Sequence, residues 1–188
     1  MNIPIFPLPI FLLPQGITRL KIFEQRYLNM VKIATKENGF GILFDNKDNN
    51  ENHTNPVIAS WVDIINFNQN KEGILQIDVQ CKSLITLTDV DMDKNNLMWA
   101  TANKIPHWQP NQHDDLTIKL GEMLLSFFEQ NSALFTLYNQ QFIDQPNWII
   151  SRWLELLPID NVHKESFLLS NSYSTACDFL STVLLTKN

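Results

Sequence analysis

Apolar and polar residues alternate with a period of two through much of the first hundred residues. The alternation is clear at 18–22 and 73–80, and it returns at 57–65 and 97–104. Because successive side chains of a strand point to opposite faces of a sheet, this spacing predicts half-buried β-strands. A continuous apolar run at 40–44 is typical of a fully buried strand. We therefore expect about six strands, enough for a small barrel or sandwich.

One helix is expected among these strands. Its apolar positions share one stripe at helical spacing: Phe23, Tyr27, Met30, Val31 and Ala34. The Asn38-Gly39 pair that follows supplies a residue able to end a helix in the left-handed conformation. This helix should pack against the sheet. The polar tract at 45–55 has no apolar residue to anchor it, which predicts a loop between two strands.

Beyond about residue 110 the period of the apolar positions changes from two to three and four. The new spacing covers 116–127, 149–157 and 176–184, and it predicts amphipathic helices. Asp144 is expected to cap the second of these, and Asp160 or Asn161 the helix that follows. The change of period predicts an α+β protein with a β-rich part at 1–110 and a helical part at 111–188.

Composition favours a globular protein with one good core or two small ones. The chain has 188 residues, 44% of them hydrophobic, with 12 Phe and 5 Trp. Its net charge of −6 and its scattered Lys and Arg argue against nucleic acid as a partner. The sequence contains no stretch of about 18 uncharged apolar residues, so we expect no membrane span. The apolar opening segment is interrupted by prolines and lacks a basic start, so we expect a cytoplasmic protein.

The sequence offers little reactive chemistry. Cys81 and Cys177 are far apart and are expected to be buried free thiols. Five glycines cannot form a phosphate loop with its lysine, and Gly39-Phe40-Gly41 follows a helix instead of preceding one. The four histidines fall in or beside predicted loops without metal-ligand spacing. We therefore expect neither a metal nor a cofactor.

The carboxylates also suggest structural use. Asp89–Asp93 and Asp114–Asp115 are interpreted as turn and linker. Glu24 falls in the first turn of the expected helix, where the helix dipole stabilises negative charge and Arg26 is near enough to pair with it. A small hydrolase would instead draw on Asp63, Glu24 and His107, and it would require a pocket that gathers them.

Three N-terminal segments resemble, in sequence and in order, the Lon N-terminal (substrate-binding) domain family. They are Ile3-Pro4-Ile5-Phe6-Pro7-Leu8, Leu13-Pro14-Gln15-Gly16 and Ile22-Phe23-Glu24-Gln25-Arg26-Tyr27-Leu28-Asn29-Met30. Weaker similarity continues at 40–43, 58–64 and 153–158, while Gln25, Ala59 and residues 80–83 depart from the family pattern. The resemblance implies a PUA-like β pseudo-barrel with one helix, followed by a C-terminal helical bundle.

The motif residues have structural explanations. Pro7 and Pro14 fix φ and withhold backbone donors, and Gly16 is expected to permit a turn that other residues would strain. Phe23 and Tyr27 are expected to anchor the helix on the sheet, beside Glu24 and Arg26. None of these residues is a nucleophile.

The resemblance implies recognition without cleavage. In full-length Lon proteases this domain is followed by an ATPase and a serine-lysine peptidase, and the present 188 residues are expected to hold neither. Expected partners are unfolded or partner proteins, with a separate ATP-dependent protease as one candidate. Phe11, Leu12 and Trp61 are candidate peptide-binding anchors if exposed, and core residues otherwise. The alternatives are an RNA-binding PUA-like module and the small hydrolase.

Overall fold

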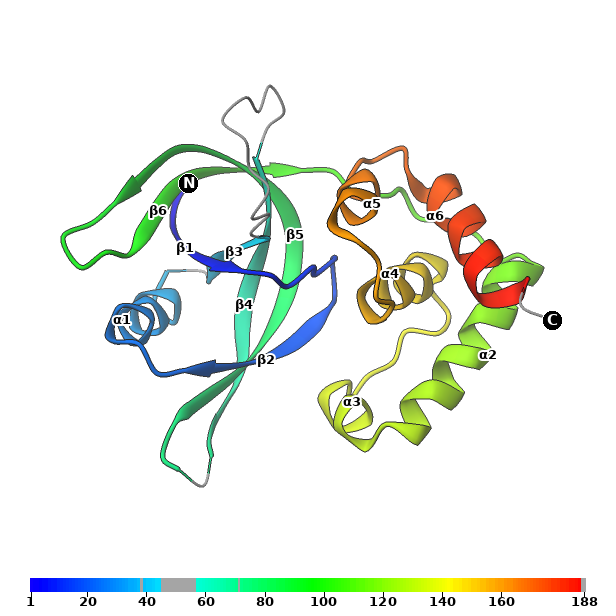
Figure 1. The fold of residues 1–188 in the computed structure, drawn as a ribbon, viewed down its shortest axis with the longest axis horizontal. Helices are drawn as coiled ribbons and strands as arrows, with labels where there is room; N and C mark the ends of the chain where they lie inside the picture. The colour runs from blue at the N-terminus through cyan, green and yellow to red at the C-terminus, as the bar shows by residue number, and fades with distance from the viewer. Residues whose placement is uncertain (38, 45–56, 71, 187–188) are drawn as a thin grey trace. The chain divides into compact units, whose positions relative to one another are not determined.

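The structure is a computed structural model that describes residues 1–37, 39–44, 57–70 and 72–186. The expected loop at 45–55 and the helix-ending Asn38 lie outside the described residues. The chain forms two compact units, Met1–Ile105 and Pro106–Asn188 (Figure 1).

The first unit is a mixed six-stranded sheet with one helix. The strand order is β2-β5-β4-β3-β1-β6; β1 and β3 are parallel, and the other pairs are antiparallel. The strands are β1 (Asn2–Leu8), β2 (Ile17–Ile22), β3 (Phe40–Phe44), β4 (Val57–Gln69), β5 (Leu75–Met92) and β6 (Met98–Ile105). Helix α1 (Gln25–Ala34) lies between β2 and β3 in the chain. The helix, β2, β3, β4, β6 and the first part of β5 fall where the apolar periodicity predicts them, whereas it predicts neither β1 nor residues 81–92 of β5.

Strand β5 is unusually long and holds the sheet together. Its first part pairs with β2, its second part pairs with β6, and β4 lies along most of its other edge (Figure 1). The pairings therefore run from β5 through β4, β3, β1 and β6 and return to β5. A bulge between Thr88 and Asp91 includes Asp89 at φ 50°. The expected turn at Asp89–Asp93 is thus wrong in part: the strand continues through the bulge to Met92, and the turn begins at Asp93.

The sheet buries side chains on both faces. Ile5 and Phe6, adjacent in β1, enter different apolar clusters: Ile5 joins Trp61 and Ile85, whereas Phe6 joins the residues under α1. The buried stripe of α1 contains Tyr27, Met30, Val31 and Ala34, as the helical spacing predicts.

Phe23 is not part of that stripe, and the expectation that it anchors the helix is wrong. The helix begins only at Gln25, because Glu24 has an extended backbone with φ −76° and ψ 137°. Phe23 therefore precedes the helical spacing, and its side chain is 71% exposed.

The turn before β2 is held by backbone hydrogen bonds to β5. Gln15 N–H donates to the Cys81 carbonyl at 2.7 Å, and Cys81 N–H donates to the Gly16 carbonyl at 2.8 Å. The left-handed residue is Gln15, with φ 66°, and not Gly16. The expectation that Gly16 supplies the special backbone conformation is therefore corrected: it is a buried residue beside the one that turns the chain.

The second unit is helical. Its helices are α2 (Asp115–Gln130), α3 (Ser132–Leu137), α4 (Pro146–Leu156), α5 (Asn161–Ser166) and α6 (Tyr173–Leu180), with a π-helical turn at Ser181–Leu185. Asp160 caps α5 by accepting from His163 N–H, as predicted. Asp114 and Asp115 are not linker residues: Asp114 caps α2, and Asp115 is its first residue. Helix α4 is preceded by Gln145 and not by the expected cap Asp144.

Aromatic side chains fill the core of this unit. Phe128, Tyr138 and Trp148 lie with ring centroids 5.3–6.0 Å apart. Two indole N–H groups find acceptors inside the unit: Trp153 donates to the Leu120 carbonyl, and Trp108 donates to Ser172. In the described part of the chain, no helix is both long and apolar enough to cross a bilayer.

Candidate functional site

A groove with a volume of about 430 Å³ opens on the first unit. We call it the α1 groove. It lies between the end of β1, the junction of β2 with α1, and the hairpin that joins β5 to β6. The lining residues are Phe6, Pro7, Leu8, Lys21, Phe23, Glu24, Arg26, Tyr27, Met92, Asn96 and Met98. Most of these side chains are apolar. They come from three segments that are far apart in the sequence, residues 6–8, 21–27 and 92–98.

The floor of the groove is aromatic. The rings of Phe6 and Tyr27 lie 4.1 Å apart between centroids and are 6% and 9% exposed. Burial raises the pKa of the Tyr27 hydroxyl. The charge of Arg26 lowers this pKa by a smaller amount, and the charge of Glu24 raises it slightly. Both rings belong to the core beneath α1, so the floor of the groove is part of that packed cluster.

One wall is an ion pair at the start of α1. Arg26 contacts the Glu24 carboxylate at 2.8 Å, as the sequence suggests, and its guanidinium lies 4.7 Å from the centre of the Tyr27 ring. Arg26 also donates to the carbonyl of Asn96 at 3.4 Å. The helix start is thereby connected to the β5–β6 turn, and the two charges largely neutralise each other.

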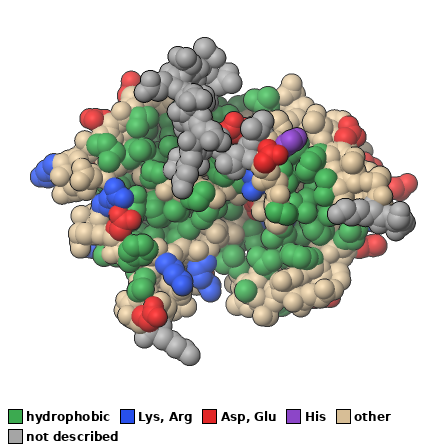
Figure 2. All heavy atoms as spheres, viewed as in Figure 1, with side chains coloured by type: hydrophobic (Ala, Val, Ile, Leu, Met, Phe, Trp, Pro, Cys, Tyr) green, Lys and Arg blue, Asp and Glu red, His purple; other side chains and the backbone are tan. Residues whose placement is uncertain are grey.

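The rim carries exposed apolar side chains. Phe23 is 71% exposed and Met92 is 47% exposed, and Met98 is half-buried beside them. Figure 2 shows hydrophobic side chains reaching the surface of this unit between scattered charges. Large exposed apolar groups around a concave surface are typical of a site that another molecule covers.

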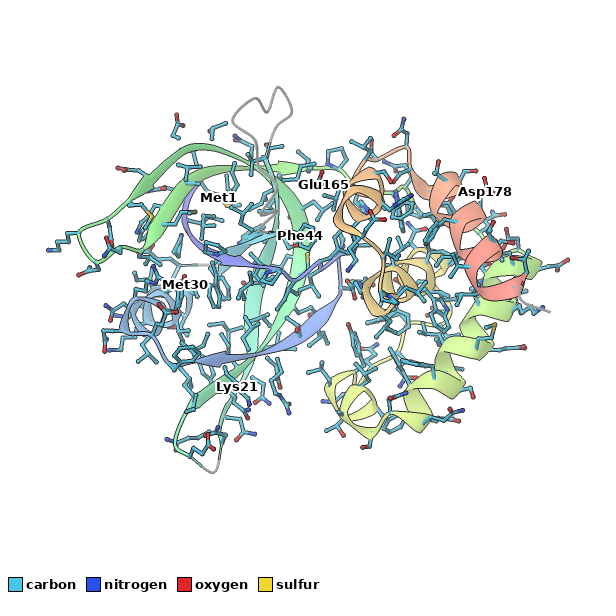
Figure 3. The ribbon with its side chains drawn as sticks, viewed as in Figure 1. Met1, Lys21, Met30, Phe44, Glu165 and Asp178 are labelled. Carbon is cyan, nitrogen blue, oxygen red and sulfur yellow. The ribbon has the colours of Figure 1, made fainter. Side chains whose placement is uncertain are left out.

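Lys21 completes the rim from β2, where Figure 3 labels it. Its neighbours Leu20 and Ile22 point into the core, so alternation places the Lys21 side chain on the outer face. Among the described residues, no carboxylate oxygen lies within 4.0 Å of its ammonium group.

The three candidate anchors lie in the core and not on the surface. Phe11 packs edge-on against Phe44 with centroids 5.9 Å apart, and Leu12 joins the cluster under α1. Trp61 is covered by the ammonium groups of Lys82 and Lys104, at 4.1 and 4.5 Å from its ring. All three are at most 6% exposed, so the exposure that their binding role required is missing.

The candidate hydrolase residues are not gathered into one site. Asp63 pairs with Lys82 at 2.8 Å, and Glu24 pairs with Arg26. His107 belongs to the second unit, where burial lowers its pKa to about 4 and Nε2 donates to the Phe167 carbonyl. Each of these three groups already has a structural partner within its own unit, among the described residues.

The cysteines and possible metal ligands also have structural explanations. Cys81 and Cys177 are both buried thiols outside any disulfide, as predicted, and burial raises the pKa of Cys177 to about 11. Within the described ranges, no group of three or more His, Cys, Asp and Glu side chains is arranged to hold a metal ion.

The groove residues Lys21, Met92 and Met98 were not predicted from the sequence as part of a site. Each looks ordinary in its own strand, and only the pairing of β5 with both β2 and β6 brings them near α1. The one available signal was the Asp93–Asn96 turn, whose polar residues are flanked by two methionines.

Comparison with known proteins identifies the family. The profile of the family described as ATP-dependent protease La (LON) substrate-binding domain matches residues 2–187, so the chain belongs to this family. No curated protein matches the chain significantly.

Two solved structures have the same fold. A Lon N-terminal domain protein from Xanthomonas campestris is similar with a TM-score of 0.72 and 21% identity, over 97% of this chain and 98% of that one. The N-terminal domain of the Mycobacterium avium complex Lon protease is similar with a TM-score of 0.65 and 12% identity, over 97% of each chain. At these identities the likeness concerns the fold.

Proposed function

We propose that this chain, as a Lon substrate-binding domain, is a recognition module that binds apolar segments of unfolded or partner polypeptides in the α1 groove. The observation that carries the proposal is the groove itself, in which exposed Phe23 and Met92 stand above the buried Phe6–Tyr27 floor. The family description supports a role in substrate recognition.

The physical basis is the burial of apolar surface. Covering an exposed Phe or Met side chain is worth about 1.5–3 kcal/mol when burial is complete. Unfolded chains expose such side chains, whereas folded proteins hide most of theirs. A groove with an aromatic floor and flexible methionines at its rim therefore favours unfolded segments without demanding one sequence.

The architecture of the chain is, in this proposal, a PUA-like pseudo-barrel that carries the groove, followed in sequence by a helical bundle. The return of the strand pairings to β5 supports the barrel, and the apolar stripes of α2, α4 and α6 support the bundle. RNA binding is the less favoured use of such a barrel, because the chain carries a net charge of −6.

We also propose that the 188 residues recognise polypeptides without cleaving them, in the cytoplasm. The candidate catalytic residues Asp63 and Glu24 are each neutralised by a different cation. A separate ATP-dependent protease is the partner that this role suggests.

The test is binding of an unfolded polypeptide to variants of the rim. The probe is reduced, carboxyamidomethylated lysozyme labelled with fluorescein, followed by anisotropy. The double variant Phe23→Ser with Met92→Ser should bind it at least about tenfold more weakly, a loss of about 1.4 kcal/mol. Unchanged affinity would overturn the proposal.

The matched control removes two other large apolar side chains that are about half exposed. Phe135 and Ile118, in the second unit, are 52% and 50% exposed. The double variant Phe135→Ser with Ile118→Ser should bind the probe within about twofold of the wild type. A loss equal to that of the rim variant would show that general surface hydrophobicity, and not the α1 groove, attracts the probe.

A further inference from the structure

We propose that the α1 groove takes its polypeptide in an extended conformation, added as a strand along residues 18–22 of β2, and prefers segments that alternate apolar, acidic and apolar residues. This inference rests on the proposed function and specifies its substrate class. Three observations carry it: the strand pairing around the groove, the donors and acceptors of its two edges, and the charge of Lys21.

Strand β2 offers one edge, over residues 18–22, to a further strand. It pairs with β5 from Ile17 opposite Gln80 to Ile22 opposite Leu75, and it is the last strand in the sheet order. Among the described residues, the segment 18–22 has no second strand beside it. An edge strand presents a row of N–H and C=O groups that an extended segment can satisfy without regard to its sequence.

The opposite side of the groove offers contact but few hydrogen bonds. Strand β6 covers β1 only from Asn2 to Ile5, which leaves Phe6, Pro7 and Leu8 to line the groove. Pro7 has no N–H, and the Leu8 carbonyl already accepts from Ile10 N–H at 2.7 Å. The β2 edge is therefore where an incoming backbone would be bonded.

The side chains of β2 set the expected pattern of the ligand. Leu20 and Ile22 point to the face that contains Phe6 and Tyr27, whereas Lys21 points to the other face. In an added strand, the residue opposite Lys21 shares its face, and the two flanking residues share the face of Leu20 and Ile22. An acidic residue between two apolar residues satisfies all three positions.

The charges of the groove favour that acidic residue. The Glu24 carboxylate is already 2.8 Å from Arg26, whereas the Lys21 ammonium has no carboxylate within 4.0 Å in the described part of the chain. The lining thus carries one net positive charge, on a protein of net charge −6. Because Lys21 is exposed to solvent, a single ion pair there should change affinity only about three- to fivefold.

The first experiment tests strand addition with a defined peptide. The parent probe is fluorescein-labelled Gly-Thr-Ile-Asp-Ile-Thr-Gly, and two isomers carry backbone N-methyl groups at alternate residues, one isomer at the odd positions and one at the even positions. In a strand added at an edge, only alternate N–H groups point to the neighbouring strand. One isomer should therefore lose at least about tenfold in affinity, and the other should bind within about threefold of the parent.

The second experiment tests the role of Lys21. Replacing Asp by Asn in the peptide should weaken binding to the wild type about three- to fivefold. Lys21→Gln should remove that difference, while the control Lys36→Gln, an exposed lysine after α1, should preserve it. Equal binding of the Asp and Asn peptides to the wild type would overturn the acidic preference.

The failure of strand addition and the failure of the proposed function give different results. If both N-methyl isomers behave alike, or the parent peptide does not bind at about 1 mM, strand addition is overturned. The proposed function still stands in that case, provided that Phe23→Ser with Met92→Ser weakens the unfolded lysozyme probe. If that rim variant binds the probe normally, the proposed function itself is overturned.

Discussion

Arg19 and Asp78 lie directly opposite each other on β2 and β5, and the Arg19 Nε–H donates to Asp78 Oδ1 at 2.6 Å. A second guanidinium nitrogen donates to Asp78 Oδ2 at 2.9 Å, and Asn66 of β4 donates to the same oxygen at 3.1 Å. A row of polar side chains thus crosses three strands on the outer face of the sheet. Asp78 is only 6% exposed although it carries a charge.

Removing Arg19 should destabilise the first unit through the carboxylate left behind. Arg19→Gln is expected to cost about 1–2 kcal/mol of unfolding free energy at pH 7, because Asp78 keeps only the Asn66 hydrogen bond. Urea unfolding followed by circular dichroism measures the loss. Lys21→Gln, on the same face of β2 without an ion pair in the described residues, is the control and should change stability by less than about 0.5 kcal/mol.

The same pair predicts a response to acid. The hydrogen bonds from Arg19 lower the pKa of Asp78 below its usual value, so its contribution to stability is present above the unfolded pKa of about 4 and is lost as the pH falls through the folded pKa. In Asp78→Asn this contribution is absent. The stability difference between wild type and Asp78→Asn should therefore shrink below about pH 4, and a difference that stays constant down to pH 2 would contradict the assignment.

His107 should act in a separate pH window. Burial lowers its folded pKa to about 4, whereas the unfolded value is about 6.5. Between these values the unfolded chain binds a proton that the folded chain does not, so stability falls as the pH is lowered from 6.5 to 4, by about 3 kcal/mol. NMR titration of the imidazole gives the pKa directly. In His107→Gln the slope of stability against pH in this window should be smaller.

Two glycines with similar backbone angles should respond differently to alanine. Gly39 and Gly73 have φ of 87° and 80°. A Cβ on Gly39 would lie 1.9 Å from the Val62 carbonyl oxygen, whereas the nearest atom to a Cβ on Gly73 is 3.6 Å away. Gly73→Ala should lower the free energy of unfolding by about 1–2 kcal/mol, because alanine is strained in the left-handed conformation. Gly39→Ala should lower it by several kcal/mol more. Equal melting temperatures for the two variants would contradict this difference.

Asp114 should stabilise the second unit as a helix cap. Its carboxylate accepts from Thr117 N–H at 2.8 Å, and the Thr117 hydroxyl accepts from Asp114 N–H in return. Asp114→Ala is expected to cost about 1–2 kcal/mol in urea unfolding. Asp115→Ala removes a neighbouring exposed carboxylate that is not the cap, and it should cost less than about 0.5 kcal/mol.

Local periodicity was sufficient to predict most elements of the fold. The alternation at 18–22 and the apolar run at 40–44 correspond to β2 and β3, and the stripe that ends at Ala34 corresponds to α1. Boundaries were less predictable when long-range pairing decided them. Strand β5 extends to Met92 because β6 pairs with it beyond the bulge, whereas the three aspartates at 89, 91 and 93 locally favour a turn.

The candidate site was harder to predict, because exposure depends on tertiary packing. Phe11 and Leu12 lie in a proline-rich segment that looks like an exposed turn, yet both side chains are buried. Phe23 resembles the first anchor of a helix, yet the extended backbone at Glu24 turns it outward. A groove assembled from β1, α1 and the β5–β6 hairpin has no counterpart in any single stretch of sequence.

The parallel pairing of β1 with β3 has a consequence for synthesis. Strand β1 pairs with residues 41–44 on one edge and with residues 98–101 on the other. Nascent β1 therefore remains without its second neighbour until residues 98–101 have also been translated. During that interval its apolar side chains are exposed to chaperones and to other nascent chains. Slower translation before β6 would therefore prolong the period in which a recognition domain is itself a substrate of chaperones.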